Sequence, residues 1–217
     1  MSRKRVAVLI SGRGSNMAAL IEAAKDESFP AEIVLVLSNK ADAGGLVTAR
    51  DNGIATAVVE HKDFGKDRAA FDAAMQKVLE AHRIDLVALA GFMRLLSPGF
   101  VGQWQNKMLN IHPALLPAFK GLDTHQRALD AKAKVHGATV HFVVPEMDAG
   151  PIIMQGAVAV RENDAEDTLA ARVLAVEHRI YPAALSLVAE DRVTVVNGRC
   201  LIDGNPVPNA ETLIPSP

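Results

Sequence analysis

Short apolar runs alternate with segments of helical period through the first half of the chain, and no other feature constrains the fold as strongly. Four runs have the length and composition of buried strands: Val6–Ile10, Ile33–Leu37, Ile54–Val59 and Leu86–Ala90. Three segments of helical period lie between them: Met17–Ala24, 44–52 and 67–82. Because strand–helix–strand units form right-handed crossovers, this order favours parallel strands. The sequence therefore predicts an α/β fold with a doubly wound, Rossmann-like, mostly parallel sheet.

The second half of the chain has a different pattern. Residues 136–144 and 152–160 are long β-like runs, and only the short turn "PEMDAG" joins them. So short a connection suits antiparallel neighbours, and we expect the sheet to continue as a mixed sheet with antiparallel strands. A helix at about 165–189 should follow, with Asn163 or Asp164 as its N-cap. The stretch "VTVVNGRCLIDG" then predicts a hairpin with Asn-Gly at its turn.

Size and composition narrow the classes of protein. The chain has 217 residues, 49% of them hydrophobic, and no repeat or linker, so we expect a single domain over residues 1–217. The formal net charge of −2 gives no reason to expect nucleic acid or a membrane surface as a partner. No apolar run approaches the ~18 residues of a membrane span. With Cys200 as the only cysteine there is no internal disulfide, which fits a reducing cytoplasm.

The loop "SGRGSN", residues 11–16, joins the first expected strand to the first expected helix. A dinucleotide fingerprint would have a third glycine where Met17 stands, and a nucleotide P-loop would have Gly-Lys-Ser/Thr, which is absent. A site for one phosphate remains, on Gly14, Ser15 and Asn16 at the helix N-terminus. The alternative is a tight turn in which Ser15 or Asn16 is an ordinary helix cap.

Two polar side chains end an apolar run in "LNIHPALLP", residues 109–117. Asn110 and His112 share one side of an extended backbone, and ligands of open α/β sheets bind at the carboxyl ends of strands. Asp148 lies in the later turn "PEMDAGP". It can be an ordinary turn former, or it can be a partner of His112 if this loop folds over the same crevice. A purely structural role is the alternative for His112.

Asn110, His112 and Asp148 together suit acyl transfer. An amide N–H of Asn110 can stabilise a developing oxyanion, and His112 can hold or pass a proton near neutral pH. The chain has no Gly-x-Ser-x-Gly elbow, and Cys200 lies in the expected hairpin, so the attacking group should belong to the substrate. With no His-Glu-x-x-His pair and no second cysteine, a zinc site is not expected.

Six motifs occur in an order and spacing that resemble one known family: "ISGRGSN", "LAGFMRLLSP", "LNIHPALLP", "HGATVHFV", "MDAGPII" and "EHRIYP". They are similar to those of the phosphoribosylglycinamide formyltransferases, the GAR transformylases of purine biosynthesis. The resemblance runs from about Arg5 to the C-terminal hairpin. Asn-x-His-Pro with a downstream Asp marks enzymes that use formyltetrahydrofolate. The Gly-Ser-Asn loop marks the branch with a ribose-phosphate substrate.

The resemblance implies that 10-formyltetrahydrofolate, as co-substrate, gives its formyl group to the primary amine of glycinamide ribonucleotide. Asn110 would bind the formyl oxygen and His112 would be the general acid. Asp148 would favour the protonated ring and order a water that relays the proton to the leaving folate nitrogen. The ribonucleotide is expected on these residues: Gly14, Ser15, Asn16 and Glu177. The folate is expected on these: Arg68, Met93, Arg94, Leu95, Leu96, Val144, Pro145, Glu146 and Met147.

The resemblance also carries expectations about partners. It implies no metal, nucleic-acid or membrane partner, and we expect a cytoplasmic monomer or weak homodimer. Pro145 and Ala149 depart from the Asp and Gly that are common in the family's folate loop, which bears on loop flexibility and pteridine affinity. Asp123 stands where the family often has His, so it is given no role.

Three other functions fit part of the pattern. A formyltetrahydrofolate deformylase uses the same three groups with water as acceptor, but behind an added N-terminal domain, whereas the first expected strand begins near Arg5. A tRNA formyltransferase would need a further C-terminal domain to hold nucleic acid. A non-catalytic phosphate- or nucleotide-binding module would explain "SGRGSN" and leave Asn110, His112 and Asp148 unexplained.

Overall fold

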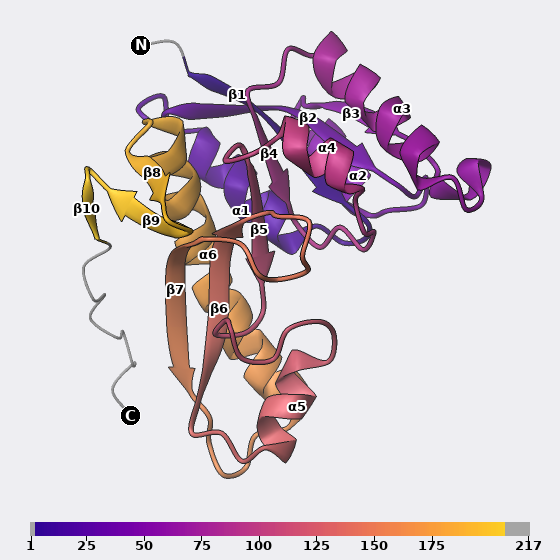
Figure 1. Cartoon of the computed structure of the whole chain (residues 1–217). Coiled ribbons are helices and arrows are strands. Elements are labelled where there is room, and N and C mark those ends of the chain that lie inside the picture. The colour runs from indigo at the N-terminus through magenta and orange to yellow at the C-terminus, as the bar shows by residue number, and fades with distance from the viewer. Residues whose placement is uncertain (1–2, 207–217) are drawn as a thin grey trace. The chain divides into compact units, whose positions relative to one another are not determined.

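The computed structural model describes residues 3–206, and the chain forms two compact units with their boundary between Asn110 and Ile111. Figure 1 follows the chain through the elements of both units. The single domain expected over residues 1–217 stays a prediction, and residues 1–2 and 207–217 lie outside the described range.

Parallel strands form the framework of the first unit, in the order β3-β2-β1-β4-β5. The strands are β1 (Lys4–Ile10), β2 (Ala31–Ser38), β3 (Ala55–Val58), β4 (Leu86–Leu89) and β5 (Met108–His112). From β1 the chain moves outward to β3 and then returns to β4 on the other side of β1, which is the doubly wound order. Val6 to Ile10 are fully buried, as a central parallel strand requires. The Rossmann-like parallel sheet is therefore confirmed.

The helices of the first unit follow its strands: α1 (Ser15–Ala24), α2 (Gly45–Asp51), η1 (His61–Phe64), α3 (Arg68–Ala81) and α4 (Pro98–Gln103). In α3, Phe71, Met75 and Leu79 recur every four residues and are buried, so this helix has one apolar face. The Asp67 side chain caps α3 by accepting a hydrogen bond from the Ala70 N–H at 2.9 Å.

Antiparallel pairing characterises the second unit, as the short turn predicts. Its elements are α5 (Thr124–Asp130), β6 (Val135–Phe142), β7 (Ile152–Ala159), α6 (Glu166–Ala189), β8 (Val193–Val196), β9 (Arg199–Ile202) and β10 (Asn205–Pro206). β6 pairs antiparallel with β7, and α6 packs on both strands. A Cβ at Gly156 would lie 2.1 Å from Val176 Cγ1, so the absence of a side chain lets α6 approach β7 closely.

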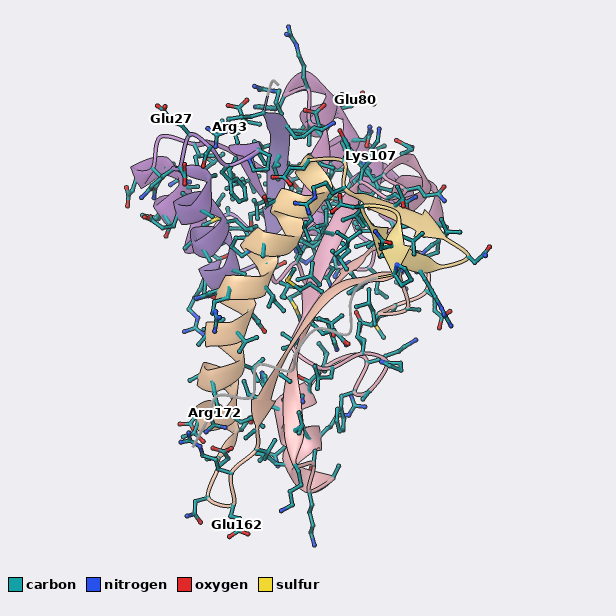
Figure 2. The ribbon with its side chains drawn as sticks, turned by 90° about the vertical axis from the view of Figure 1, so that its left-hand side faces the viewer. Arg3, Glu27, Glu80, Lys107, Glu162 and Arg172 are labelled. Carbon is teal, nitrogen blue, oxygen red and sulfur yellow. The ribbon has the colours of Figure 1, made fainter. Side chains whose placement is uncertain are left out.

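The start of α6 corrects the sequence prediction. The N-cap is Ala165, not Asn163 or Asp164. Arg172 holds both oxygens of Asp164 at 2.7 and 2.8 Å, and the Arg161 N–H donates to it at 2.7 Å (Figure 2 labels Arg172). Because these bonds occupy the Asp164 carboxylate, the Thr168 hydroxyl accepts from the Ala165 N–H at the helix start instead.

The C-terminal hairpin forms as expected. β8 and β9 pair antiparallel, and Asn197 and Gly198 at the turn have φ of 50° and 74°. Positive φ at both central positions is the property of the Asn-Gly hairpin turn. Within residues 3–206, the structure has no helix with the length and apolarity that a membrane crossing requires.

Candidate active site

The glycine loop of the first unit leaves β1 and enters α1. Gly14 is the N-cap of α1, with a left-handed φ of 72°, and the helix begins at Ser15. The alternative in which Ser15 or Asn16 caps the helix is therefore wrong. Gly14 has no side chain that could accept hydrogen bonds from the first turn, and an anionic ligand can take that place.

The beginning of α2 supports this loop. The Gly45 N–H donates to the Gly12 carbonyl at 3.0 Å. A Cβ at Gly45 would lie 2.6 Å from Ile10 Cδ1 and 3.2 Å from the Gly12 and Arg13 carbonyl oxygens. Glycine at this position thus lets the two backbones approach, and the contact restrains the loop that is expected to bind phosphate.

Ser11 joins the glycine loop to the loop that follows β4. Its hydroxyl donates to Asn39 Oδ1 at 2.6 Å and accepts from the Met93 N–H at 2.8 Å, while its N–H donates to the Gly91 carbonyl at 3.2 Å. β1 and β4 are neighbours on either side of the point where the strand order reverses, which is where doubly wound sheets bind ligands. Sequence reasoning missed Ser11 and Asn39, because a lone serine and asparagine at strand ends carry no distinctive signal.

The predicted binding residues are divided between the units. The first unit contains the glycine loop, Arg68 and residues 93–96, with Met93 and Leu95 59% and 60% exposed. The second unit contains residues 144–147 and Glu177, which is buried on α6.

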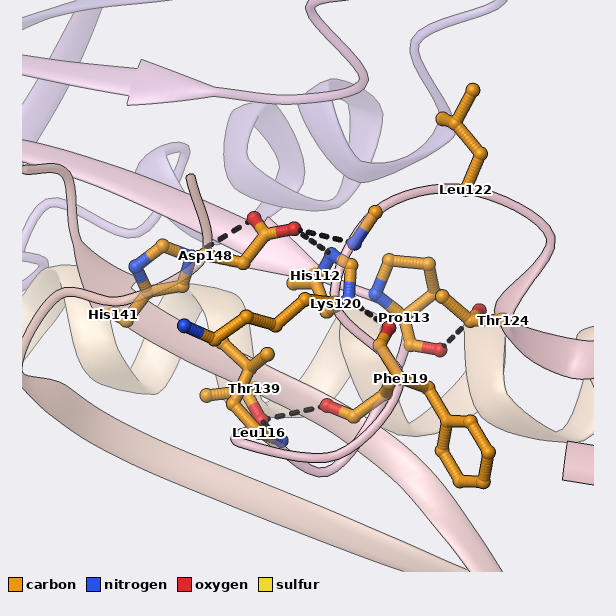
Figure 3. A network of polar contacts seen from close by, with 12 residues as sticks. His112, Pro113, Leu116, Phe119, Lys120, Leu122, Thr124, Thr139, His141 and Asp148 are labelled. Carbon is orange, nitrogen blue, oxygen red and sulfur yellow. Dashed lines mark hydrogen bonds and ion pairs between the residues drawn. The ribbon is translucent and has the colours of Figure 1, made fainter. Parts of the chain in front are cut away.

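His112 lies at the carboxyl end of β5, where Pro113 ends the strand. Asn110 precedes it by two residues in the same strand, so the two side chains share one face. His112 is 5% exposed. Its Nε2 lies 3.0 Å from the Phe119 carbonyl oxygen, and its Nδ1 lies 3.5 Å from Asp148 Oδ2 (Figure 3). Because a carbonyl only accepts hydrogen bonds, we assign a proton to Nε2.

Asp148 approaches His112 from the loop that precedes β7. Its backbone has a left-handed φ of 51°, and its side chain is 11% exposed. The Gly121 N–H donates to the same Oδ2 at 2.9 Å. The structure thus brings two of the residues expected to be catalytic within 3.5 Å of each other, and a main-chain hydrogen bond holds the Asp148 carboxylate.

Threonine side chains hold the segment that follows His112. The Thr139 hydroxyl donates to the Ala114 carbonyl at 2.7 Å and accepts from the Leu116 N–H at 3.0 Å, and Thr124 donates to the Pro113 carbonyl at 2.7 Å (Figure 3). Thr139 is fully buried in β6. These bonds restrain the segment whose Phe119 carbonyl and Gly121 N–H contact His112 and Asp148.

The same segment contacts the loop expected to bind folate. Lys120 Nζ lies 3.3 Å from Glu146 Oε1. A Cβ at Gly121 would lie 3.8 Å from Met147 Cε, so these residues are in van der Waals range. Both members of the ion pair are exposed, so its contribution to stability is small.

Groups suited to a metal ion were also sought. Across residues 3–206, no set of three or more His, Cys, Asp or Glu side chains is placed to hold one. Cys200 is buried in β9, and burial raises the pKa of its thiol to about 11, so little thiolate exists near neutral pH.

Comparisons with known proteins identify the family of the chain. The formyl transferase family model matches residues 4–185. The trifunctional purine biosynthetic protein adenosine-3 of Bos taurus is 54% identical over 91% of this chain, which spans 20% of that protein's length. The chain thus spans about a fifth of that trifunctional relative. The phosphoribosylglycinamide formyltransferase of Escherichia coli K12 is 44% identical over 94% of this chain and 95% of that protein.

Solved structures show the same likeness. The crystal structure of phosphoribosylglycinamide formyltransferase from Brucella melitensis is 51% identical, with a TM-score of 0.84 over 91% of this chain and 100% of that one. A formyltetrahydrofolate deformylase from Pseudomonas syringae is more distant, 29% identical with a TM-score of 0.84 over 93% of this chain and 66% of that one. Because the family model matches most of the chain and relatives align over nearly all of it, the chain belongs to the formyl transferase family.

Proposed function

We propose that the protein transfers the formyl group of 10-formyltetrahydrofolate directly to the amine of glycinamide ribonucleotide, as a phosphoribosylglycinamide formyltransferase. The products are formylglycinamide ribonucleotide and tetrahydrofolate. The observation that carries the proposal is the His112–Asp148 pair at 3.5 Å, in which His112 follows Asn110 by two residues in β5. The name of the relative from Escherichia coli supports the same activity.

Each group has a role in this reaction. The substrate amine attacks the formyl carbon, and the Asn110 amide N–H stabilises the negative charge that develops on the formyl oxygen. His112 acts as general acid, while Asp148 holds the imidazolium and orders a water that carries a proton to the leaving folate nitrogen. The bond from the formyl carbon to that nitrogen then breaks, and the amine gives up one proton through the same water, which restores His112. The buried Cys200 plays no part, so no acyl-enzyme forms.

The proposed binding residues are those that the family resemblance implies. The ribonucleotide phosphate binds Gly14, Ser15 and Asn16 at the start of α1, and Glu177 contacts the amine or the ribose. Residues that bind the folate are Arg68, Met93, Arg94, Leu95, Leu96, Val144, Pro145, Glu146 and Met147. The folate is a co-substrate, and no metal takes part.

A formyltetrahydrofolate deformylase is the second candidate, because the same three groups would serve water as acceptor. The glycine loop favours the transferase, since the phosphate that we propose for it at the start of α1 has no use in hydrolysis. The lower identity of the deformylase structure favours the same choice.

One assay separates the two candidates. Purified protein is mixed with 10-formyltetrahydrofolate, and release of tetrahydrofolate is followed with and without glycinamide ribonucleotide, together with mass spectrometry of the ribonucleotide. Release that requires the ribonucleotide, with one formyl group gained per folate, is the expected result. Equal release without the ribonucleotide would establish the deformylase.

The setting of the enzyme is part of the proposal. A protein whose one cysteine is a buried thiol suits a reducing cytoplasm. We propose that it acts there as a monomer or weak homodimer on small-molecule substrates, without nucleic-acid or membrane partners.

A further inference from the structure

The Asp148 carboxylate lies between two buried imidazole rings, and only one of them has a role so far. Asp148 Oδ2 is 3.5 Å from His112 Nδ1, and Asp148 Oδ1 is 3.9 Å from His141 Nε2. Figure 3 shows the carboxylate with one ring on each side. Both distances are those of ion pairs rather than of short hydrogen bonds.

Main-chain carbonyls determine which nitrogen of each ring carries a proton. His112 Nε2 is 3.0 Å from the Phe119 carbonyl oxygen, and His141 Nδ1 is 2.8 Å from the Phe142 carbonyl oxygen. Each of these nitrogens must be a donor, because a carbonyl only accepts. In a neutral ring the other nitrogen is then unprotonated. In both rings that other nitrogen is the one that faces Asp148.

A proton that is added to this cluster can go to either ring. One proton, placed on His112 Nδ1 or on His141 Nε2, turns one contact into an imidazolium–carboxylate pair and leaves the other ring neutral. A second proton would place two positive rings on one carboxylate, so the two rings compete.

We propose that His141 is a positioning residue that acts through Asp148, and that it competes with His112 for the proton of the His112–Asp148–His141 cluster. That His112 is the general acid rests on the proposed function, whereas the competition between the rings rests on the geometry alone. Near neutral pH, burial keeps His141 neutral. On acidification His141 takes up a proton, shares the negative charge of Asp148 and weakens the hold of Asp148 on His112.

The surroundings agree with this division. His141 is 2% exposed, and burial lowers its pKa, which Asp148 raises and His112 lowers further. His112 in turn interacts electrostatically with His125 of α5 and His136 of β6. β7 has no ionisable residue between Ile152 and Ala159, and the buried ionisable residues of α6, which packs on β6, are Glu177 and Tyr181.

Gly150 keeps the Asp148 loop against His141. A Cβ at Gly150 would lie 1.7 Å from the Phe142 carbonyl oxygen and 3.3 Å from His141 Nδ1. The Phe142 N–H donates to the Pro151 carbonyl at 3.0 Å. The carbonyl that selects the tautomer of His141 is thus also the surface on which the Asp148 loop packs.

Nitrogen-15 NMR of histidine side chains tests the proposal without any substrate. In their neutral forms the rings should be the Nε2–H tautomer for His112 and the Nδ1–H tautomer for His141. His112→Asn should raise the pH at which His141 titrates, and Asp148→Asn should lower it, each by about one pH unit. His82→Asn is the matched control, because His82 Nδ1 also bonds a main-chain carbonyl, that of Val78 at 2.8 Å, but in the first unit.

His141→Asn is the test in the enzyme itself. Its amide can still bond the Phe142 carbonyl, but it presents no titratable nitrogen to Asp148. The acid limb of the pH profile of kcat should move to lower pH, while KM for the ribonucleotide stays unchanged. A loss of structure alone would lower kcat at every pH without moving that limb.

The two proposals fail separately. Titrations of His112 and His141 that each stay within error when the other ring is replaced would overturn the competition, even if formyl transfer is observed. Coupled titrations in a protein that does not formylate the ribonucleotide would overturn the proposed function alone.

Discussion

The two units present their predicted functional residues in different ways. In the first unit the glycine loop and residues 93–96 follow parallel strands, and main-chain groups and the Ser11 hydroxyl join these two loops. In the second unit the two catalytic candidates, His112 and Asp148, are enclosed ionisable side chains next to the buried His141, and main-chain groups of neighbouring loops contact them. The parallel sheet thus offers positions for binding, and the second unit provides an enclosed environment in which protons can be held and moved.

His112→Ala should have the largest effect, because it removes the proton-carrying ring of the second unit. We expect kcat to fall by about 10²–10⁴-fold, the usual contribution of a general acid. Steady-state kinetics with both substrates measures it, with KM for the ribonucleotide little changed. The control is His82→Ala in the first unit, which should stay close to wild type. A loss of less than tenfold for His112→Ala would remove the chemical distinction between the units.

Glycine substitutions compare the packing of the two loops. Gly150→Ala places a Cβ 1.7 Å from the Phe142 carbonyl oxygen, so the Asp148 loop must shift, and we expect a loss of about 1–3 kcal/mol of stability together with lower kcat. At Gly12 in the first unit, a Cβ would meet nothing within 4 Å, and Gly12→Ala should change the free energy of unfolding by less than about 0.5 kcal/mol. Urea denaturation of both variants measures this, and equal losses would show that the loops are packed alike.

Acidification should loosen the second unit first. His136 is 1% exposed, and burial, with the charges of His125 and His112, lowers its pKa from 6.5 to about 4. In the unfolded chain His136 takes up a proton near pH 6.5, whereas in the folded chain it does not. The contribution of His136 to stability is therefore complete above pH 6.5 and is lost as the pH falls through 4. At pH 5 we expect a loss on the order of 1–2 kcal/mol.

Hydrogen exchange at pH 7 and pH 5, corrected for intrinsic rates, locates this effect. Peptides from β6 should lose protection before those from β1, whose unit has the half-buried His61 and His82. His136→Phe should reduce the difference. Equal loss of protection in β1 and β6 would contradict the idea that acid sensitivity resides in the second unit.

Ser11→Ala should have the smallest effect, and it tests the first unit as a binding framework. Loss of the hydroxyl leaves the Met93 N–H without that acceptor, which we expect to cost about 1 kcal/mol of stability. KM for folate should rise a few-fold with kcat nearly unchanged. Ser28→Ala, an exposed position in the same unit, is the control. A fall in kcat as large as that of His112→Ala would mean that the first unit also takes part in the chemistry.

The sequence by itself determined the order of strands and helices, the glycine loop, the hairpin turn, and the placement of Asn110 and His112 at a strand end. Each of these depends on residues that are neighbours along the chain, through the periodicity of apolar side chains and the backbone preferences of Gly, Asn and Pro. The six motifs also indicated the family to which the chain belongs, and the comparisons confirmed it.

Only the tertiary structure decided how distant residues combine. The start of α6 moved to Ala165 because Arg172, two turns into the helix, binds the carboxylate of Asp164. Asp148 reaches both His112 and His141 because the loop before β7 packs on the Phe142 carbonyl, and the same carbonyl selects the tautomer of His141. The protonation of a ring and the approach of a carboxylate to it depend on which side chains are buried next to each other in the fold. The local sequence pattern does not contain that information.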